Sequence, residues 1–264
     1  MPSRLIVFLQ VIAFAVMIFM NALANSLPLN GYTTGQLSGF YPNRFVPAGF
    51  TFAIWGVIYL LLLVWLIGSS VYLWKNDPHH PAFRHARLLA PFFIISSVFN
   101  SLWIVAWHYL YVSGSLLIML ALLVTLIRAY RSLQQDRAAI SGFNWFILYA
   151  PFVVYLAWIS VATIANTTAL LVHLEWTGGG LSEDVWSAIM IVIAAGLSAW
   201  FGLYKGELAF TLVTAWAFWG IYKGQLAASE LAGSVALAAC IGSLAAGSYG
   251  WWRTRNNAPI DGVL

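Results

Sequence analysis

Eight apolar runs follow one another along this chain, and nearly all are long enough for a helix to cross a lipid bilayer. A bilayer core about 30 Å thick needs about 20 apolar residues per helix. Hydrophobic residues make up 62% of the 264 positions and charged residues only 8%. The runs lie at 5–25, 50–74, 88–110, 114–131, 143–172, 185–204, 207–222 and 226–252, and the seventh is the shortest. The sequence therefore predicts an all-α, polytopic membrane helix bundle of about eight transmembrane helices, because no run shows the alternation of a membrane barrel.

The first run has two interpretations. Arg4, the apolar stretch that follows it and the small residues Ala22-Leu23-Ala24 resemble a secretory signal with its cleavage site. The apolar part reaches about 20 residues, which is longer than the usual core of a signal. We therefore expect a retained helix.

The distribution of Lys and Arg predicts the orientation, because basic residues near helix ends stay on the cytoplasmic side. With the amino terminus inside, ten of the twelve lie in inner segments: Arg4, Lys75, Arg84, Arg87, Arg128, Arg131, Arg137, Lys205, Arg253 and Arg255. Arg44 and Lys223 lie outside, and the fifth connection is acidic. We expect an inner membrane of the bacterial type with both termini cytoplasmic. The anionic inner leaflet of the lipid bilayer is then a sufficient partner for a chain with a formal charge of +4. We therefore infer no nucleic-acid partner from this charge.

Signatures of catalysis and metal binding are missing. Every Asp, Glu, Lys and Arg lies at or near a helix end, with Glu207 and Glu230 closest to the interior. A charged ion pathway is therefore not expected. The sequence contains no phosphate loop, no nucleophile elbow and no zinc motif of the His-Glu-x-x-His type. Cys240 is the single cysteine and fits a small buried residue. We assign no catalytic residue and no metal site, and favour a protein without enzymatic activity.

Three helix faces carry aromatic residues deep within apolar runs. Their residues are spaced three, four or seven apart, so each set lies on one side of its helix. The sets are Trp55 and Tyr59; Asn100, Trp103 and Trp107; and Tyr155, Trp158, Ala162 and Ala165. If the three faces converge, they enclose an apolar slot with aromatic walls and few polar groups. Such a slot suits a flat hydrophobic small molecule.

These residues resemble the tryptophan-rich sensory protein family, also called the translocator protein or peripheral-type benzodiazepine receptor family. In that family the second helix carries a Trp eight residues after a Pro and a Tyr four further on, as Pro47, Trp55 and Tyr59 do here. The third helix carries Asn-x-x-Trp, and the fifth carries Trp-x-x-x-Ala followed by Asn four residues on. The matching residues of this sequence are Asn100, Trp103, Trp158, Ala162 and Asn166.

The resemblance implies a fold, a ligand and a set of binding residues. It covers residues 1–175 as a five-helix bundle and leaves 176–264 as a three-helix C-terminal extension. In the family, the second- and fifth-helix Trp residues line a pocket for porphyrins and other flat apolar ligands. That implies lining by Trp55 and Trp158, with Tyr59, Asn100, Trp103 and Ala162 beside them, and a porphyrin or haem as ligand rather than resident cofactor. Two departures are Pro151, seven residues before Trp158, and Trp107-His108 in place of paired Phe.

Several alternatives stay open at this point. The protein could act as a sensor, scavenger or carrier, as a transporter of small molecules or lipids, or as a slow light-dependent porphyrin-degrading enzyme resting on Trp55 and Trp158. The aromatic residues could equally be helix packing, and His108 is better explained by hydrogen bonding than by haem ligation. The long loop 26–46 is a candidate lid. The small residues Gly242, Ala246 and Gly250 allow close helix packing, either within the chain or in a homodimer.

Overall fold

The computed structural model describes residues 2–26, 29–135 and 142–256, and Arg137 lies outside them. Within those residues the chain is helical and contains no strand, as predicted. The long helices are α1 (Ser3–Ser26), α3 (Ile54–Lys75), α4 (Pro81–His108), α5 (Val112–Gln135), α7 (Ala150–His173), α8 (Glu183–Lys205), α9 (Leu208–Gln225) and α10 (Glu230–Asn256). The short ones are α2 (Thr34–Ser38), α6 (Phe143–Leu148), and the 3-10 turns η1 (Leu29–Gly31), η2 (Gly49–Ala53) and η4 (Gly178–Gly180).

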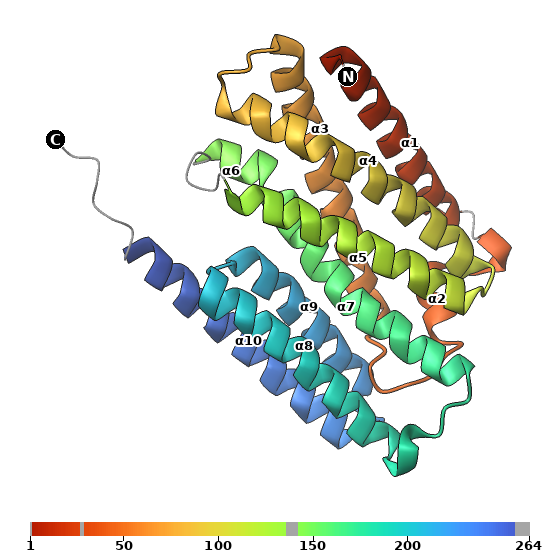
Figure 1. The fold of residues 1–264 in the computed structure, drawn as a ribbon. Coiled ribbons are helices and arrows are strands. Elements are labelled where there is room, and N and C mark those ends of the chain that lie inside the picture. The colour runs from red at the N-terminus through yellow and green to blue at the C-terminus, as the bar shows by residue number, and fades with distance from the viewer. Residues whose placement is uncertain (1, 27–28, 136–141, 257–264) are drawn as a thin grey trace. The chain divides into compact units, whose positions relative to one another are not determined.

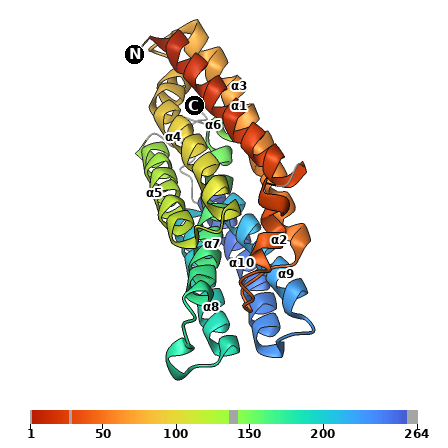
Figure 2. The same cartoon turned by 90° about the vertical axis from the view of Figure 1, so that its right-hand side faces the viewer.

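Two compact units make up the chain. The N-terminal unit consists of Met1–Pro42 and Phe52–Trp176, and the C-terminal unit of Asn43–Thr51 and Thr177–Leu264. In the first unit α4 lies beside α1, α3 and α5, and α7 packs on α5 and α3 (Figure 1). In the second, α8, α9 and α10 lie side by side as a three-helix bundle (Figure 2). The nine residues 43–51 therefore belong with helices that follow them by more than 130 positions.

Seven helical segments of the described chain are long and apolar enough to span a membrane. They correspond to seven of the eight predicted runs, with ends shifted by up to seven residues, the largest shift being at Pro81, where residue 88 was predicted. The eighth, α9, has 18 residues and closes on Lys223-Gly224-Gln225, and it is not among the seven. The protein is thus an all-α polytopic membrane bundle, with α9 as its shortest long helix.

Residues 143–172, predicted as one run, form two helices. The break falls at Tyr149, where α6 ends and α7 begins. Pro151 accounts for the break, because it lacks a backbone N–H and its ring clashes with the carbonyl four residues earlier. The candidate span 143–173, which contains α7, is the most deeply buried of the seven. In an 18-residue apolar stretch of this span 83% of the residues are buried, against 22–44% in the other six candidate spans.

Hydroxyl groups and small residues hold the C-terminal bundle together. The Ser198 hydroxyl of α8 lies 2.6 Å from Thr214 Oγ1 of α9 and donates to Ser243 Oγ of α10 over 2.9 Å. On α10, Gly250 packs so closely on Gly202 of α8 that a Cβ atom there would overlap its carbonyl. The small-residue stripe is therefore used within the chain at this point.

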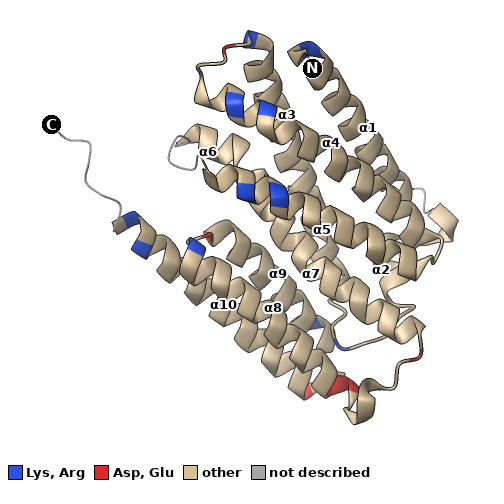
Figure 3. Cartoon of the chain, in the orientation of Figure 1, with Lys and Arg blue, Asp and Glu red and all other residues tan. Residues whose placement is uncertain are grey.

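Charged residues lie at or near the helix ends in the described part of both units (Figure 3). At one end of the C-terminal bundle lie Lys205, Arg253 and Arg255, and at the other lie Glu183 and Asp184. The intervening length of each helix is apolar or uncharged, which agrees with a bilayer around it. The inside or outside assignment of these ends remains a prediction.

Candidate functional site

Trp55 is the centre of an aromatic cluster formed by α3, α4 and α7. Its ring stacks on Tyr59 of the same helix with centroids 5.5 Å apart and an interplanar angle of 20°. It lies 6.2 Å from Trp103 of α4 and meets Trp158 of α7 edge-on at 6.0 Å. The three aromatic faces singled out in the sequence therefore converge in the N-terminal unit. The rings contact one another between these helices.

Asn100 connects three helices at the back of this cluster. Its Oδ1 accepts a hydrogen bond from the Asn21 amide of α1 over 2.7 Å, and its own amide donates to the Tyr155 hydroxyl of α7 over 3.1 Å. Asn100 and Tyr155 are fully buried. Buried amides in a membrane bundle are normally paired in this way, because hydrocarbon offers no alternative partner.

A second amide anchors the neighbouring ring. Trp103 donates its indole N–H to Asn166 Oδ1 of α7 over 3.0 Å, and the Asn166 amide donates to the Ser115 hydroxyl of α5 over 3.0 Å. Trp103 is therefore fixed in orientation between three helices. Ala162 lies on α7 one turn after Trp158 and is half-buried.

An open pocket of about 420 Å³ lies on the other side of Trp55, between α1, α2 and α3. Such a volume is within the range of small-molecule sites. Trp55 and Tyr59 form part of its wall, whereas Asn100, Trp103, Trp158 and Ala162 do not line it. Its lining residues are Ile18, Asn21, Ala22, Asn25, Thr34, Phe52, Ala53, Trp55, Gly56 and Tyr59. The sequence-based set thus divides into two wall residues and four that lie outside the wall.

The polar groups of the pocket have spare hydrogen-bonding capacity. Asn21 uses its amide nitrogen for Asn100 and for the Met17 carbonyl, and within the described residues nothing donates to its Oδ1. The Tyr59 hydroxyl is buried beside Asn100 and Tyr155 without completing a hydrogen bond there. A buried polar atom without a partner is uncommon in folded proteins and indicates a water or ligand position. The pocket wall is thus mostly apolar, and its polar residues are Asn21, Asn25, Thr34 and Tyr59.

Three small residues form the exposed rim of the pocket. Ala22, Ala53 and Gly56 are exposed, and a Cβ atom added at Gly56 would meet no atom within 4 Å. No bulky side chain at these positions covers the opening. The pocket is therefore open at these three residues.

His108 fastens the loop above the pocket to the end of α4. Its ring nitrogens lie 3.1 Å from the Leu29 carbonyl and 3.1 Å from the Thr34 hydroxyl, and its backbone carbonyl accepts from the Asn30 amide over 3.0 Å. The neighbouring Trp107 donates to the Thr34 carbonyl. His108 is completely buried, so both nitrogens are occupied by the protein. Thr34, which lines the pocket, is thereby held in place at the start of α2.

Sequence reasoning missed eight of the ten lining residues: Ile18, Asn21, Ala22, Asn25, Thr34, Phe52, Ala53 and Gly56. Asn21 and Asn25 are spaced four apart near the end of the first apolar run, and this spacing is the one signal that the sequence offered. Thr34 and Phe52 reach the pocket through loop packing that has no periodic pattern. Among residues 2–26, 29–135 and 142–256, no group of three or more His, Cys, Asp or Glu side chains comes together as metal ligands would.

Comparison with protein-family models gives one match, to the family described as TSPO-like protein, over residues 7–249. The match extends past residue 175, where the motif resemblance ended, and includes α8, α9 and α10 as far as residue 249. Comparison with curated proteins and with solved structures gives no significant match.

Proposed function

The chain belongs to the TSPO-like protein family, and on that premise we propose that this integral membrane protein binds a flat hydrophobic small molecule, such as a porphyrin, in the pocket between α1, α2 and α3. We place its ligand against Trp55 and Tyr59 and assign the protein to a sensor, scavenger or carrier role. No chemical step is part of the proposal.

The parallel stack of Trp55 and Tyr59 carries this proposal. Two rings 5.5 Å apart and inclined by 20° present an extended aromatic wall to an open pocket. Flat π-systems favour offset stacking or edge contacts on such a wall. Asn21 Oδ1, together with the side chains of Asn25 and Thr34, supplies the few polar groups that fix the orientation of an otherwise apolar ligand.

The small-residue rim supports a lipophilic rather than a water-soluble ligand. Ala22, Ala53 and Gly56 lie on helices that contain candidate membrane spans. A molecule dissolved in the bilayer would reach the opening without first crossing water. This geometry suits a carrier or scavenger of membrane-dissolved compounds.

The decisive experiment is titration of the purified protein in detergent with protoporphyrin IX, followed by quenching of Trp fluorescence. Gly56→Leu places a side chain into the pocket without a clash in the helix, and we expect it to raise the Kd at least fivefold. Gly196→Leu is the matched control, because Gly196 is an exposed glycine of α8 where an added Cβ atom would likewise meet nothing within 4 Å. Absence of saturable binding to the unaltered protein, or equal affinities for both variants, would contradict the proposed site.

A further inference from the structure

The segment 43–51, here called the strap, is tied to α9 by three hydrogen bonds. The Ala48 amide donates to the Gly220 carbonyl over 2.9 Å, the Gln225 amide to the Val46 carbonyl over 3.0 Å, and the Trp216 indole to the Thr51 carbonyl over 3.0 Å. Phe50 also lies edge-on to the Trp216 ring at 5.4 Å. The three bonds are spread along the strap from Val46 to Thr51.

Two glycines of α9 make this contact sterically possible. Gly220 and Gly224 are one turn apart, and a Cβ atom at Gly220 would collide with the Thr51 hydroxyl. A Cβ at Gly224 would lie 2.9 Å from the Ala48 nitrogen and 3.0 Å from the Val46 oxygen. These neighbours are backbone atoms and cannot rotate away. The strap therefore requires glycine at position 224.

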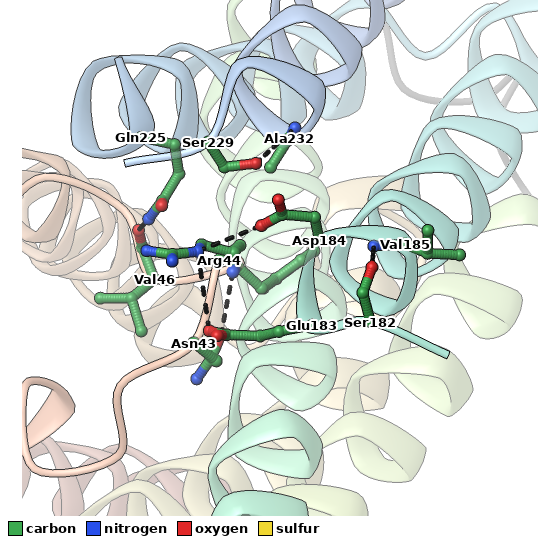
Figure 4. A network of polar contacts seen from close by, with 11 residues as sticks. Asn43, Arg44, Val46, Ser182, Glu183, Asp184, Val185, Gln225, Ser229 and Ala232 are labelled. Atoms are coloured by element: carbon green, nitrogen blue, oxygen red, sulfur yellow. Dashed lines mark hydrogen bonds and ion pairs between the residues drawn. The ribbon is translucent and has the colours of Figure 1, made fainter. Parts of the chain in front are cut away.

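An ion pair fixes the other end of the strap (Figure 4). Arg44 Nε donates to Asp184 Oδ1 over 3.2 Å and lies 3.8 Å from Glu183 Oε1. Both acids are in the first turn of α8, where negative charge also favours the helix dipole. The Asn43 side chain accepts from the Phe45 amide and shapes the turn between the two fastenings.

The strap continues directly into the pocket wall. Its last residues, Gly49–Thr51, form the beginning of η2, and the same 3-10 turn ends with Phe52 and Ala53, which line the pocket. Trp55 follows in the first turn of α3. The end of the strap and the three wall residues Phe52, Ala53 and Trp55 are thus parts of one continuous helical stretch of chain.

From this continuity we propose that the C-terminal three-helix unit is a positioning element for the ligand pocket, acting through the strap. The proposal rests on the proposed function for its effect on affinity. With the strap fastened to α9 and α8, the pocket wall at Phe52–Trp55 is held in its binding geometry. Ligand binding in turn stabilises the fastened strap, because coupling between two sites is reciprocal.

The test compares Gly224→Ala with Gly233→Ala. Gly233 is a buried glycine of α10 whose added Cβ would find its nearest atom at 3.9 Å, an ordinary contact. In both variants the first measurement is hydrogen exchange of the strap amides, above all that of Ala48. We expect faster exchange in Gly224→Ala alone, together with a Kd for protoporphyrin IX that is at least fivefold higher.

A ligand-independent measurement keeps the test decisive if the unaltered protein binds no porphyrin. Cys240 is the only cysteine, so a Cys240→Ala background allows Ala53→Cys in the wall to be labelled with a maleimide. Releasing the strap by Gly224→Ala should change the labelling rate severalfold, and Gly233→Ala should not. Failure of porphyrin binding with a changed labelling rate would refute the proposed ligand and leave the positioning role standing. An unchanged labelling rate, with strap exchange accelerated, would refute the positioning role.

Discussion

Asn21 of α1 donates an amide hydrogen bond to Oδ1 of Asn100 in α4 across 2.7 Å. Asn100 in turn donates its own side-chain amide to the Tyr155 hydroxyl of α7. Three helices separated by 79 and 55 positions in the sequence are joined by this one buried side chain. Asn21 also faces the pocket. The same chain of polar side chains therefore joins three helices and reaches the pocket wall.

Replacing Asn100 by Leu should lower the free energy of unfolding by about 1–3 kcal/mol, because two interhelical hydrogen bonds are lost and the Asn21 amide keeps only the Met17 carbonyl. Denaturant unfolding in bicelles, followed by circular dichroism, measures the change. Asn25→Leu is the control, since Asn25 is exposed and bonds only to the Asn21 carbonyl of its own helix. Equal stability of the two variants would argue against the three-helix connection.

Trp55 and Trp158 should differ in their effect on ligand affinity. Trp55 is part of the pocket wall, whereas Trp158 packs behind it and leaves its indole nitrogen without a partner in the described structure. We expect Trp55→Phe to weaken protoporphyrin IX binding at least fivefold and Trp158→Phe to weaken it less than twofold. Isothermal titration on both variants, with far-ultraviolet circular dichroism as a folding control, measures this. The opposite order would place the ligand between α3 and α7 instead.

Most of the helical framework could be predicted from the sequence, because each span leaves an uninterrupted apolar run. Seven predicted runs correspond to candidate spans within four residues at each end, except that the third span begins at Pro81, seven residues before the predicted start. The break at Tyr149 was missed, although Pro151 was visible, because the apolar pattern continues across it. Local backbone sterics determined the break, and hydrophobicity alone does not reveal them.

The candidate site was only partly accessible from sequence. Residue spacing placed Trp55, Trp103 and Trp158 on aromatic faces of three helices and left their convergence open; the Trp103 and Trp158 rings lie 6.2 and 6.0 Å from the Trp55 ring. Spacing could not show that packed rings leave the open volume on the α1 side. The strap was equally hidden, since its hydrogen bonds to Trp216 and Gln225 span 165 and 179 positions and follow no local pattern.

His108 should stabilise the loop that carries Thr34. In His108→Phe the ring volume is kept, but the Leu29 carbonyl and the Thr34 hydroxyl lose their partner at a buried position. We expect unfolding to become easier by about 1–3 kcal/mol, with faster hydrogen exchange in residues 29–41. His79→Phe is the control, because His79 is exposed in the connection before α4. Unchanged exchange in the loop would show that α2 is held by other contacts.

Arg44 should contribute little to global stability and more to the strap. Its pair with Asp184 is partly exposed, with side-chain exposures of 33% and 43%, and such pairs contribute about 0–1 kcal/mol. Arg44→Gln should therefore leave the unfolding midpoint nearly unchanged, while hydrogen exchange of residues 44–48 accelerates by about two- to fivefold. The charge-swapped variant Arg44→Asp with Asp184→Arg should recover part of the protection, although Glu183 remains nearby. If Arg44→Gln and the swapped variant exchange at the same rate as the unaltered protein, the backbone bonds to α9 hold the strap by themselves.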